Sequence, residues 1–138
     1  MKFFLCLSIF MVPVLVPLQA QDTLNPATVK IKVLYGTASY YANKFNGRKT
    51  ASGEIFSQQK LTAACNVLPF GTWIRVTNLR NGRTVIVKVN DRLHSKMKRV
   101  VDLSRSAAQK LGYLNSGLTR VKVEVLGKKK PENPVEIK

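Results

Sequence analysis

Acidic residues are scarce in this chain of 138 residues, where seven Asp and Glu stand against 23 Lys and Arg for a formal net charge of +16. Residues 31–126 hold 17 basic and four acidic residues, so this part alone carries +13 and the charge is not confined to a tail. Such a charge attracts anionic partners, namely cell-wall polymers, acidic lipid headgroups or nucleic acid. An acidic residue kept in so basic a domain is a candidate for acid–base chemistry.

Cysteine is almost absent as well. Cys6 lies in an N-terminal segment that we expect to be removed, which leaves Cys65 alone. A single cysteine cannot form an internal disulfide, so the mature fold must hold without one. We expect Cys65 to be a buried, inert thiol, and the alternative is a reactive thiolate created by basic neighbours.

The sequence also has no apolar run as long as a membrane span. Lys2 precedes an apolar stretch over residues 3–16, which ends at Pro17 and is shorter than the roughly 20 residues that a spanning helix needs. This arrangement is typical of a secretory signal, so we predict a cleaved signal peptide at residues 1–20 and no transmembrane segment after its removal. We expect an exported protein of the periplasm or cell envelope. No cysteine stands at the expected cut, so we predict no lipid anchor, and export makes nucleic acid an improbable partner.

The length allows one small domain. Residues 21–30 are polar and contain Pro26, which indicates a linker. Residues 128–138 begin with three lysines and contain two prolines, which indicates a basic, solvated tail. The sequence therefore predicts one domain at residues 31–127, with no internal repeat.

Alternation of apolar and polar residues predicts strands over residues 74–77, 84–89 and 120–125, with weaker candidates over 33–41 and 60–64. Asn81-Gly82 lies between the first two and predicts a hairpin, because both residues tolerate positive φ. One short helix is predicted between a Ser104 cap and Gly112, with a buried side formed by Ala107, Ala108 and Leu111. Short strands with one short helix favour an all-β fold closed into a small barrel.

Two of the four acids between residues 31 and 126 have structural interpretations. Glu124 lies opposite the valine face of its strand, so we expect it on the surface beside Lys122. Asp102 stands at the predicted helix start, where free backbone amides and the helix dipole favour a carboxylate.

The other two acids are functional candidates. Asp91 shares its parity with Val85, Val87 and Val89, which predicts an inward-facing carboxylate at a barrel mouth. The alternative is an aspartate that forms a turn by bonding nearby amides. Glu54 follows Ser52-Gly53 in a polar loop and, taken alone, would be an ordinary surface residue.

Short motifs follow one another in a fixed order over residues 35–126: Gly36-Thr37-Ala38-Ser39-Tyr40-Tyr41, Asn46-Gly47-Arg48-Lys49-Thr50-Ala51-Ser52-Gly53-Glu54, Leu61-Thr62-Ala63-Ala64, Val76-Thr77-Asn78-Leu79, Asn81-Gly82-Arg83, Val89-Asn90-Asp91-Arg92, Val101-Asp102-Leu103-Ser104 and Ala107-Ala108 through Leu111-Gly112. In this order they resemble the rare lipoprotein A (RlpA) family, whose barrel is the double-psi type also found in expansins.

The resemblance implies a six-stranded double-psi β-barrel with one or two short helices. It also implies a lytic transglycosylase acting on peptidoglycan glycan strands, with a preference for glycan stripped of its stem peptides. By position, Asp91 would be the catalytic aspartate and Glu54 the essential glutamate, while Cys65 occupies the place of a family histidine. We expect no cofactor, no metal and a monomer. Glu54 would keep Asp91 protonated, steady an oxocarbenium-like state or bind the substrate.

Other residues are predicted to meet the glycan. Tyr40 and Tyr41, together with Phe45, can present aromatic faces to sugars. Arg48 and Arg92 can meet muramic carboxylates. Trp73, the largest aromatic side chain, is assigned first to the core. His94 is expected in a solvated loop.

Two departures from the family pattern leave a second interpretation open. Cys65 replaces a histidine, and Leu93-His94-Ser95 stands where the family commonly has Gly-Pro-Phe. Both lie beside the expected site. The alternative function is therefore a non-catalytic, expansin-like module that binds cell walls.

Overall fold

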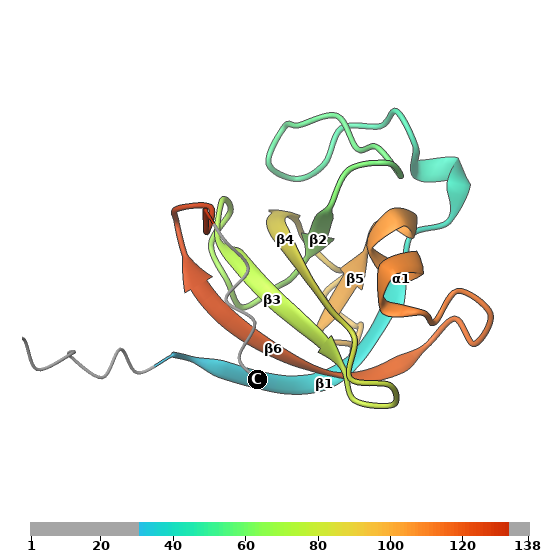
Figure 1. The fold of residues 1–138 in the computed structure, drawn as a ribbon. Coiled ribbons are helices and arrows are strands. Elements are labelled where there is room, and N and C mark those ends of the chain that lie inside the picture. The colour runs from blue at the N-terminus through green and yellow to red at the C-terminus, as the bar shows by residue number, and fades with distance from the viewer. Residues whose placement is uncertain (1–30, 133–138) are drawn as a thin grey trace, which may run out of the picture.

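The computed structural model describes residues 31–132, which form a closed six-stranded barrel (Figure 1). The elements in chain order are β1 (Val33–Tyr40), the 3-10 turn η1 (Asn43–Phe45), β2 (Thr62–Ala64), β3 (Trp73–Asn78), β4 (Thr84–Asp91), β5 (Val101–Leu103), α1 (Arg105–Leu111) and β6 (Thr119–Gly127). Around the barrel the strands follow the order β1-β5-β2-β4-β3-β6. The predicted all-β class and barrel closure are confirmed.

The barrel mixes parallel and antiparallel pairs. β1 pairs with β5 and β2 with β4 in parallel, while the remaining neighbours are antiparallel. Parallel neighbours need long connections, because a tight turn can only reverse the chain. The connection from β1 to β2, residues 41–61, lies over the end of the barrel at which β4 finishes (Figure 1).

Alternation along the strands builds the core. Ile74 and Val76 of β3, Val87 and Val89 of β4 and Val123 of β6 are fully buried. Each such side chain contributes roughly 1.5–3 kcal/mol through burial. The strands predicted over residues 74–77, 84–89 and 120–125 are therefore confirmed, and the valines supply the inner layer.

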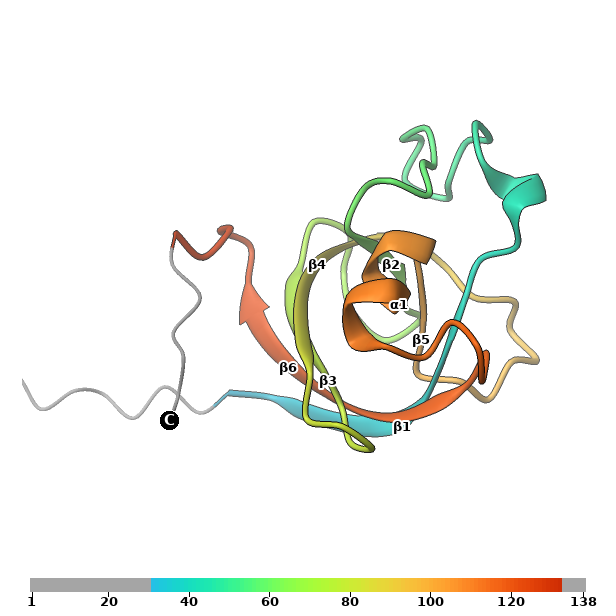
Figure 2. The same cartoon turned by 45° about the vertical axis from the view of Figure 1, so that its right-hand side comes forward.

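Helix α1 has the predicted ends. The Ser104 hydroxyl oxygen accepts a hydrogen bond from the Ala107 amide (3.4 Å), and Gly112 ends the helix in the left-handed conformation. Ala107, Ala108 and Leu111 are buried. The helix packs against β4 and β1, and Figure 2 looks onto it with the strands curving around it.

A bulge in β4 changes the expected direction of Asp91. Ala63 pairs with Val89, but Ala64 pairs with Asp91, so Asn90 is an extra residue in β4. The alternation shifts by one residue there. Asp91 consequently shares a face with Ala64 on the outside of the barrel and is partly exposed. The prediction of an inward-facing side chain was wrong, although β4 does end at this residue.

Two other side chains lie elsewhere than predicted. Trp73 is partly buried on the outer face and not in the core, because the buried positions of β3 begin at Ile74. Asp102 lies in β5 and does not bond the helix amides, because its two oxygens accept hydrogen bonds from Arg99 at 2.8 and 3.0 Å. The first helix amides are instead satisfied by Ser104 and by Gln58, whose Oε1 accepts a hydrogen bond from the Arg105 amide at 2.8 Å.

Candidate active site

The connection between β1 and β2 contains a small hairpin, residues 47–56, which we call the site hairpin. The Phe56 amide donates to the Arg48 carbonyl oxygen at 2.7 Å and closes it. Gly53 lies in its turn with a φ of 88°, a conformation that residues with a Cβ rarely adopt. The turn fixes the backbone from which the Glu54 side chain projects.

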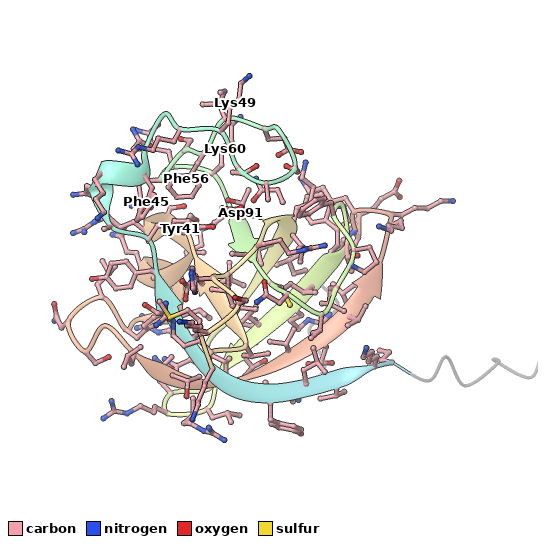
Figure 3. All side chains as sticks on the ribbon, turned by 180° about the vertical axis from the view of Figure 1, so that it is seen from behind. Tyr41, Phe45, Lys49, Phe56, Lys60 and Asp91 are labelled. Carbon is pink, nitrogen blue, oxygen red and sulfur yellow. The ribbon has the colours of Figure 1, made fainter. Side chains whose placement is uncertain are left out.

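Three aromatic rings hold the site hairpin against the barrel. Tyr41, directly after β1, has its ring centre 4.2 Å from that of Phe56 and 5.8 Å from that of Phe45. Phe56 is 3% exposed. Figure 3 shows the three rings gathered beside Asp91. The hairpin is therefore packed on the barrel through its own apolar residue.

The Asp91 carboxylate lies at the end of β4, under the connection that carries the site hairpin (Figure 3). Its Oδ2 accepts a hydrogen bond from the Tyr41 hydroxyl at 2.6 Å. Its Oδ1 accepts two more at 2.8 Å, from the amides of Ala51 and Arg92. The two hydrogen bonds from backbone amides are those expected of a turn-forming aspartate. The hydrogen bond from Tyr41 is not part of that turn pattern. Since two amides already occupy Oδ1, Oδ2 is the oxygen on which a proton can be carried.

Tyr41 keeps its own proton and so remains a donor. Burial is the main cause that raises the pKa of Tyr41 far above its usual range, and the hydrogen bond to Asp91 and the charge of that carboxylate add to it. The sequence predicted Tyr41 as a sugar-binding residue. In the structure its hydroxyl is directed at Asp91.

Glu54 has a different environment. Its Oε1 lies 3.0 Å from Lys88 Nζ, and its Oε2 accepts a hydrogen bond from Asn90 Nδ2 at 3.1 Å. These bonds, the Asn90 one foremost, lower the pKa of Glu54 below its ordinary value. Its side chain is 46% exposed. An ionised, tethered and accessible carboxylate is suited to stabilising positive charge, and it is a poor proton donor.

Folding brings these two acids, 37 positions apart in sequence, to one edge of the barrel. Asn90 binds the Glu54 side chain, and the next residue, Asp91, binds the hairpin through Ala51. The Ser52 amide donates to the Asn90 carbonyl oxygen at 3.3 Å. The β4 bulge thus presents two consecutive residues to the same hairpin.

Cys65 contacts the site only through its main chain. Its amide donates to the Asp91 carbonyl oxygen at 3.1 Å. The side chain is fully buried in the hydrophobic core with Val89 and Leu68. The position predicted to correspond to a family histidine therefore offers no polar side chain to the site.

The two predicted arginines are placed differently. Arg92 Nη1 donates to the Cys65 carbonyl oxygen at 2.7 Å, and the guanidinium lies 3.9 Å from the ring centre of Phe70. These contacts hold the chain just after β4. Arg48 is exposed on the site hairpin, 5.8 Å from the ring centre of Phe45.

Tyr40 is not brought to Asp91 by any contact of the described residues. Its hydroxyl donates to the Leu114 carbonyl oxygen at 2.9 Å, and its ring meets the edge of Tyr113 at 5.9 Å. It packs against the core. The sequence pairs it with Tyr41, but neighbours on an extended chain point in opposite directions.

Sequence reasoning missed three residues of this site. Asn90 and Lys88 hold Glu54, and Phe56 anchors the hairpin. Asn90 lies within the Val89-Asn90-Asp91-Arg92 motif, and Phe56 is an aromatic residue in a mostly polar loop. The motif and the aromatic residue were the signals available in the sequence. Neither shows which distant residue Asn90 or Phe56 contacts.

Residues 31–132 contain no group of three His, Cys, Asp or Glu side chains placed to hold a metal ion. No helix in this part of the chain is long and apolar enough to cross a bilayer.

The closed mixed barrel belongs to the double-psi class, as two solved structures indicate. The Streptomyces papain inhibitor superimposes with a TM-score of 0.57 at 23% identity, covering 68% of this chain and 94% of that one. An expansin variant from Clavibacter michiganensis, solved with cellohexaose, gives 0.56 at 22% identity, covering 75% and 54%. At this identity the likeness shows the fold alone.

Sequence comparison gives the family. Residues 34–123 match the family model described as lytic transglycolase. The endolytic peptidoglycan transglycosylase RlpA of Pseudomonas aeruginosa is 49% identical over an alignment of 111 residues that covers 72% of this chain and 33% of that protein. The chain belongs to this RlpA-like lytic transglycolase family. It spans about a third of the length of that relative.

Proposed function

We propose that this domain is a lytic transglycosylase that cleaves the bond between N-acetylmuramic acid and N-acetylglucosamine in peptidoglycan. Its substrate is glycan freed of stem peptides. Membership of the family supports the reaction class. The observation that carries the proposal is that two consecutive β4 residues bind the site hairpin, Asn90 through Glu54 and Asp91 through Ala51, so that both acids lie at one edge of the barrel.

In the first step Asp91 acts as the acid. Its proton, carried on Oδ2, passes to the glycosidic oxygen as the bond from that oxygen to C1 of the muramic sugar breaks. The N-acetylglucosamine side leaves with that proton as a hydroxyl group. Tyr41 is a positioning residue here, because its hydroxyl bonds Oδ2 and orients the carboxyl group.

In the second step the same carboxylate acts as the base. The 6-hydroxyl of the muramic sugar attacks C1, and Asp91 Oδ2 takes its proton. The new bond closes a 1,6-anhydro ring. Asp91 ends protonated as it began, and no water is consumed.

Glu54 supports the positive charge that develops between these steps. Its lowered pKa keeps it ionised, and Lys88 and Asn90 hold it in place. Of the three roles open from the sequence, stabilisation of an oxocarbenium-like state is the one that these contacts favour.

The substrate lies outside the cytoplasm, which agrees with the export predicted from the sequence. The signal at residues 1–20 and the linker at 21–30 lie outside the described residues, and the tail at 128–138 lies partly outside them. These segments, the absence of a lipid anchor and the monomeric state remain predictions.

Product chemistry tests the reaction. The purified protein is incubated with stem-peptide-free glycan in water enriched in oxygen-18, and the soluble products are weighed by mass spectrometry. We expect 1,6-anhydro-muramic ends without the label. Reducing ends that contain oxygen-18 would instead mark a hydrolase, and the transglycosylase proposal would then be wrong.

A binding module without catalysis is the second candidate, and one observation favours it. Cys65 is fully buried, so the site has no side chain equivalent to the family histidine. This candidate predicts that the protein pellets with cell walls and releases no soluble product. Cys65→His, checked for folding by thermal melting, distinguishes the two, because a gain of product would identify a weakened enzyme.

A further inference from the structure

A long groove of about 1230 Å³ extends from Glu54 across the outer face of β4 and β3 to β6; we call it the outer groove. Its lining includes Glu54 but not Asp91, so it continues beyond the two acids. Residues 130–132 form part of its wall. Lys130 Nζ lies 5.7 Å from the ring centre of Trp73, and Lys128 Nζ donates to the Phe70 carbonyl oxygen at 2.6 Å.

Strand pairing arranges the floor of the outer groove in rows. Thr62 of β2 lies beside Lys88 of β4, and Lys88 lies beside Trp73 of β3. In the next row, Arg75 of β3 lies beside Glu124 of β6. A broad aromatic face is thus flanked by cations and hydroxyl groups, a combination that matches a sugar chain with acidic substituents.

The outer groove is electropositive. Six basic and three acidic side chains line it. Glu54 and Glu124, on its floor, are each paired with basic neighbours. Among residues 31–132, three lining lysines have no carboxylate within ion-pair distance: Lys60, Lys110 and Lys130.

Thr62 gives an independent indication that the floor of the outer groove meets a polar ligand. The residue is 7% exposed, and it lines the outer groove. Its hydroxyl has no hydrogen-bond partner among residues 31–132. Leaving a buried hydroxyl unbonded costs about 1–3 kcal/mol, so an oxygen-rich ligand beside it would recover that cost.

We infer that the outer groove binds a length of glycan strand through its free lactyl carboxylates, with Trp73 against a sugar face and Lys60 and Lys130 near the carboxylates. This rests on the proposed function and adds a subsite next to the cleavage point. A stem peptide converts each lactyl carboxylate into an amide and adds bulk. The groove would therefore make the preference for stripped glycan largely electrostatic.

Trp73 supplies a direct probe, because it is the single tryptophan of the chain. Stem-peptide-free glycan is titrated into the full protein bearing Asp91→Asn, which prevents cleavage during the measurement. We expect a saturable change in tryptophan emission. Glycan whose carboxylates have been converted to methylamides should bind at least about fivefold more weakly, because the charge contacts are lost.

A charge-matched pair of variants locates the contact. Lys60→Ala with Lys130→Ala should weaken binding about fivefold to tenfold. Lys96→Ala with Lys98→Ala removes the same charge from an exposed loop outside the groove and should change binding less than twofold. Equal effects of the two pairs, or glycan binding without any change in emission, would overturn the inference.

The outcomes separate this inference from the proposed function. If the wild-type protein released anhydro products but Trp73 emission did not respond to glycan, the proposed function would stand and the glycan subsite would be wrong. If Trp73 emission changed saturably but no product was released, the glycan-binding groove would stand and the transglycosylase proposal would be wrong. If a phosphate-rich wall polymer bound more tightly than glycan in the same titration, the assigned ligand would be wrong.

Discussion

Asp91 and Glu54 are both carboxylates at one edge of the barrel, yet their surroundings give them different chemistry. Asp91 receives one hydroxyl and two amide donors and lies under the connection that carries the site hairpin. Glu54 is half-exposed and tethered to a lysine and an asparagine. At the scale of single residues, the division of labour follows from which donors reach each oxygen.

Tyr41→Phe removes one of those donors without changing the ring. We expect turnover to fall about tenfold with little change in KM, because the carboxyl group loses its orientation while the glycan contacts remain. Stability should fall by about 1–2 kcal/mol in urea unfolding. Tyr40→Phe is the matched control, since its hydroxyl bonds only the Leu114 carbonyl oxygen. A similar loss of turnover in both variants would contradict the assigned role.

The lowered pKa of Glu54 predicts a pH dependence with a definite sign. The unfolded chain protonates this group near its ordinary value of 4.5, and the folded chain only at lower pH. Its stabilising effect is therefore complete above about pH 4.5 and disappears as the pH falls through the folded pKa. Urea unfolding of wild type and Glu54→Gln should differ at pH 6 and converge towards pH 3. A difference that grows on acidification would show that the tether is absent.

At the scale of elements, the site depends on a hairpin and a bulge that meet. Long, regular strands were predictable from alternation, as 84–89 within β4 shows. β5, with three residues, is too short for a pattern, and β2, also three residues long, was indicated only by the weak candidate over 60–64. The bulge at Asn90 was not predictable, because it arises from the pairing of β4 with β2. Because of this one extra residue, the alternation of β4 predicted an inward-facing Asp91, whereas the side chain lies on the outer face.

Phe56 packs the site hairpin against Tyr41, so Phe56→Ala should loosen this hairpin. Loss of a buried phenylalanine costs about 3–5 kcal/mol when the cavity cannot close. We expect faster trypsin cleavage after Arg48 or Lys49, measured by mass spectrometry. Ile55→Ala is the control, because Ile55 is 54% exposed. Equal cleavage rates for Phe56→Ala and wild type would show that the aromatic contacts do not hold the hairpin.

The whole molecule combines a closed barrel with a strongly basic surface. The sequence could indicate the charge, the fold class and, through the ordered motifs, the family. It could not indicate that Trp73 lies outside the barrel beside Lys88, since that depends on where the buried alternation of β3 begins. The groove is a property of four strands together, β2, β4, β3 and β6, and of the segment after β6.

Salt should weaken the attachment of the whole protein to peptidoglycan. Raising the ionic strength from 0.05 to 0.5 M shortens the Debye length from about 14 to about 4 Å, which screens most surface attraction. We expect the fraction that pellets with stripped glycan to fall severalfold. Glycan with amidated carboxylates is the control and should show a much smaller change. Salt-independent pelleting with both polymers would argue against electrostatic attachment.

The central claim is that Asp91 transfers the proton in cleavage. It is tested most directly by the rate of anhydro-product release from stripped glycan by Asp91→Asn, with Asp102→Asn as a control that loses a carboxylate from β5, a strand that does not pair with β4. We expect a loss of about 100-fold or more for Asp91→Asn, with glycan binding retained, and a rate near wild type for the control. Release by Asp91→Asn within about threefold of wild type would contradict it.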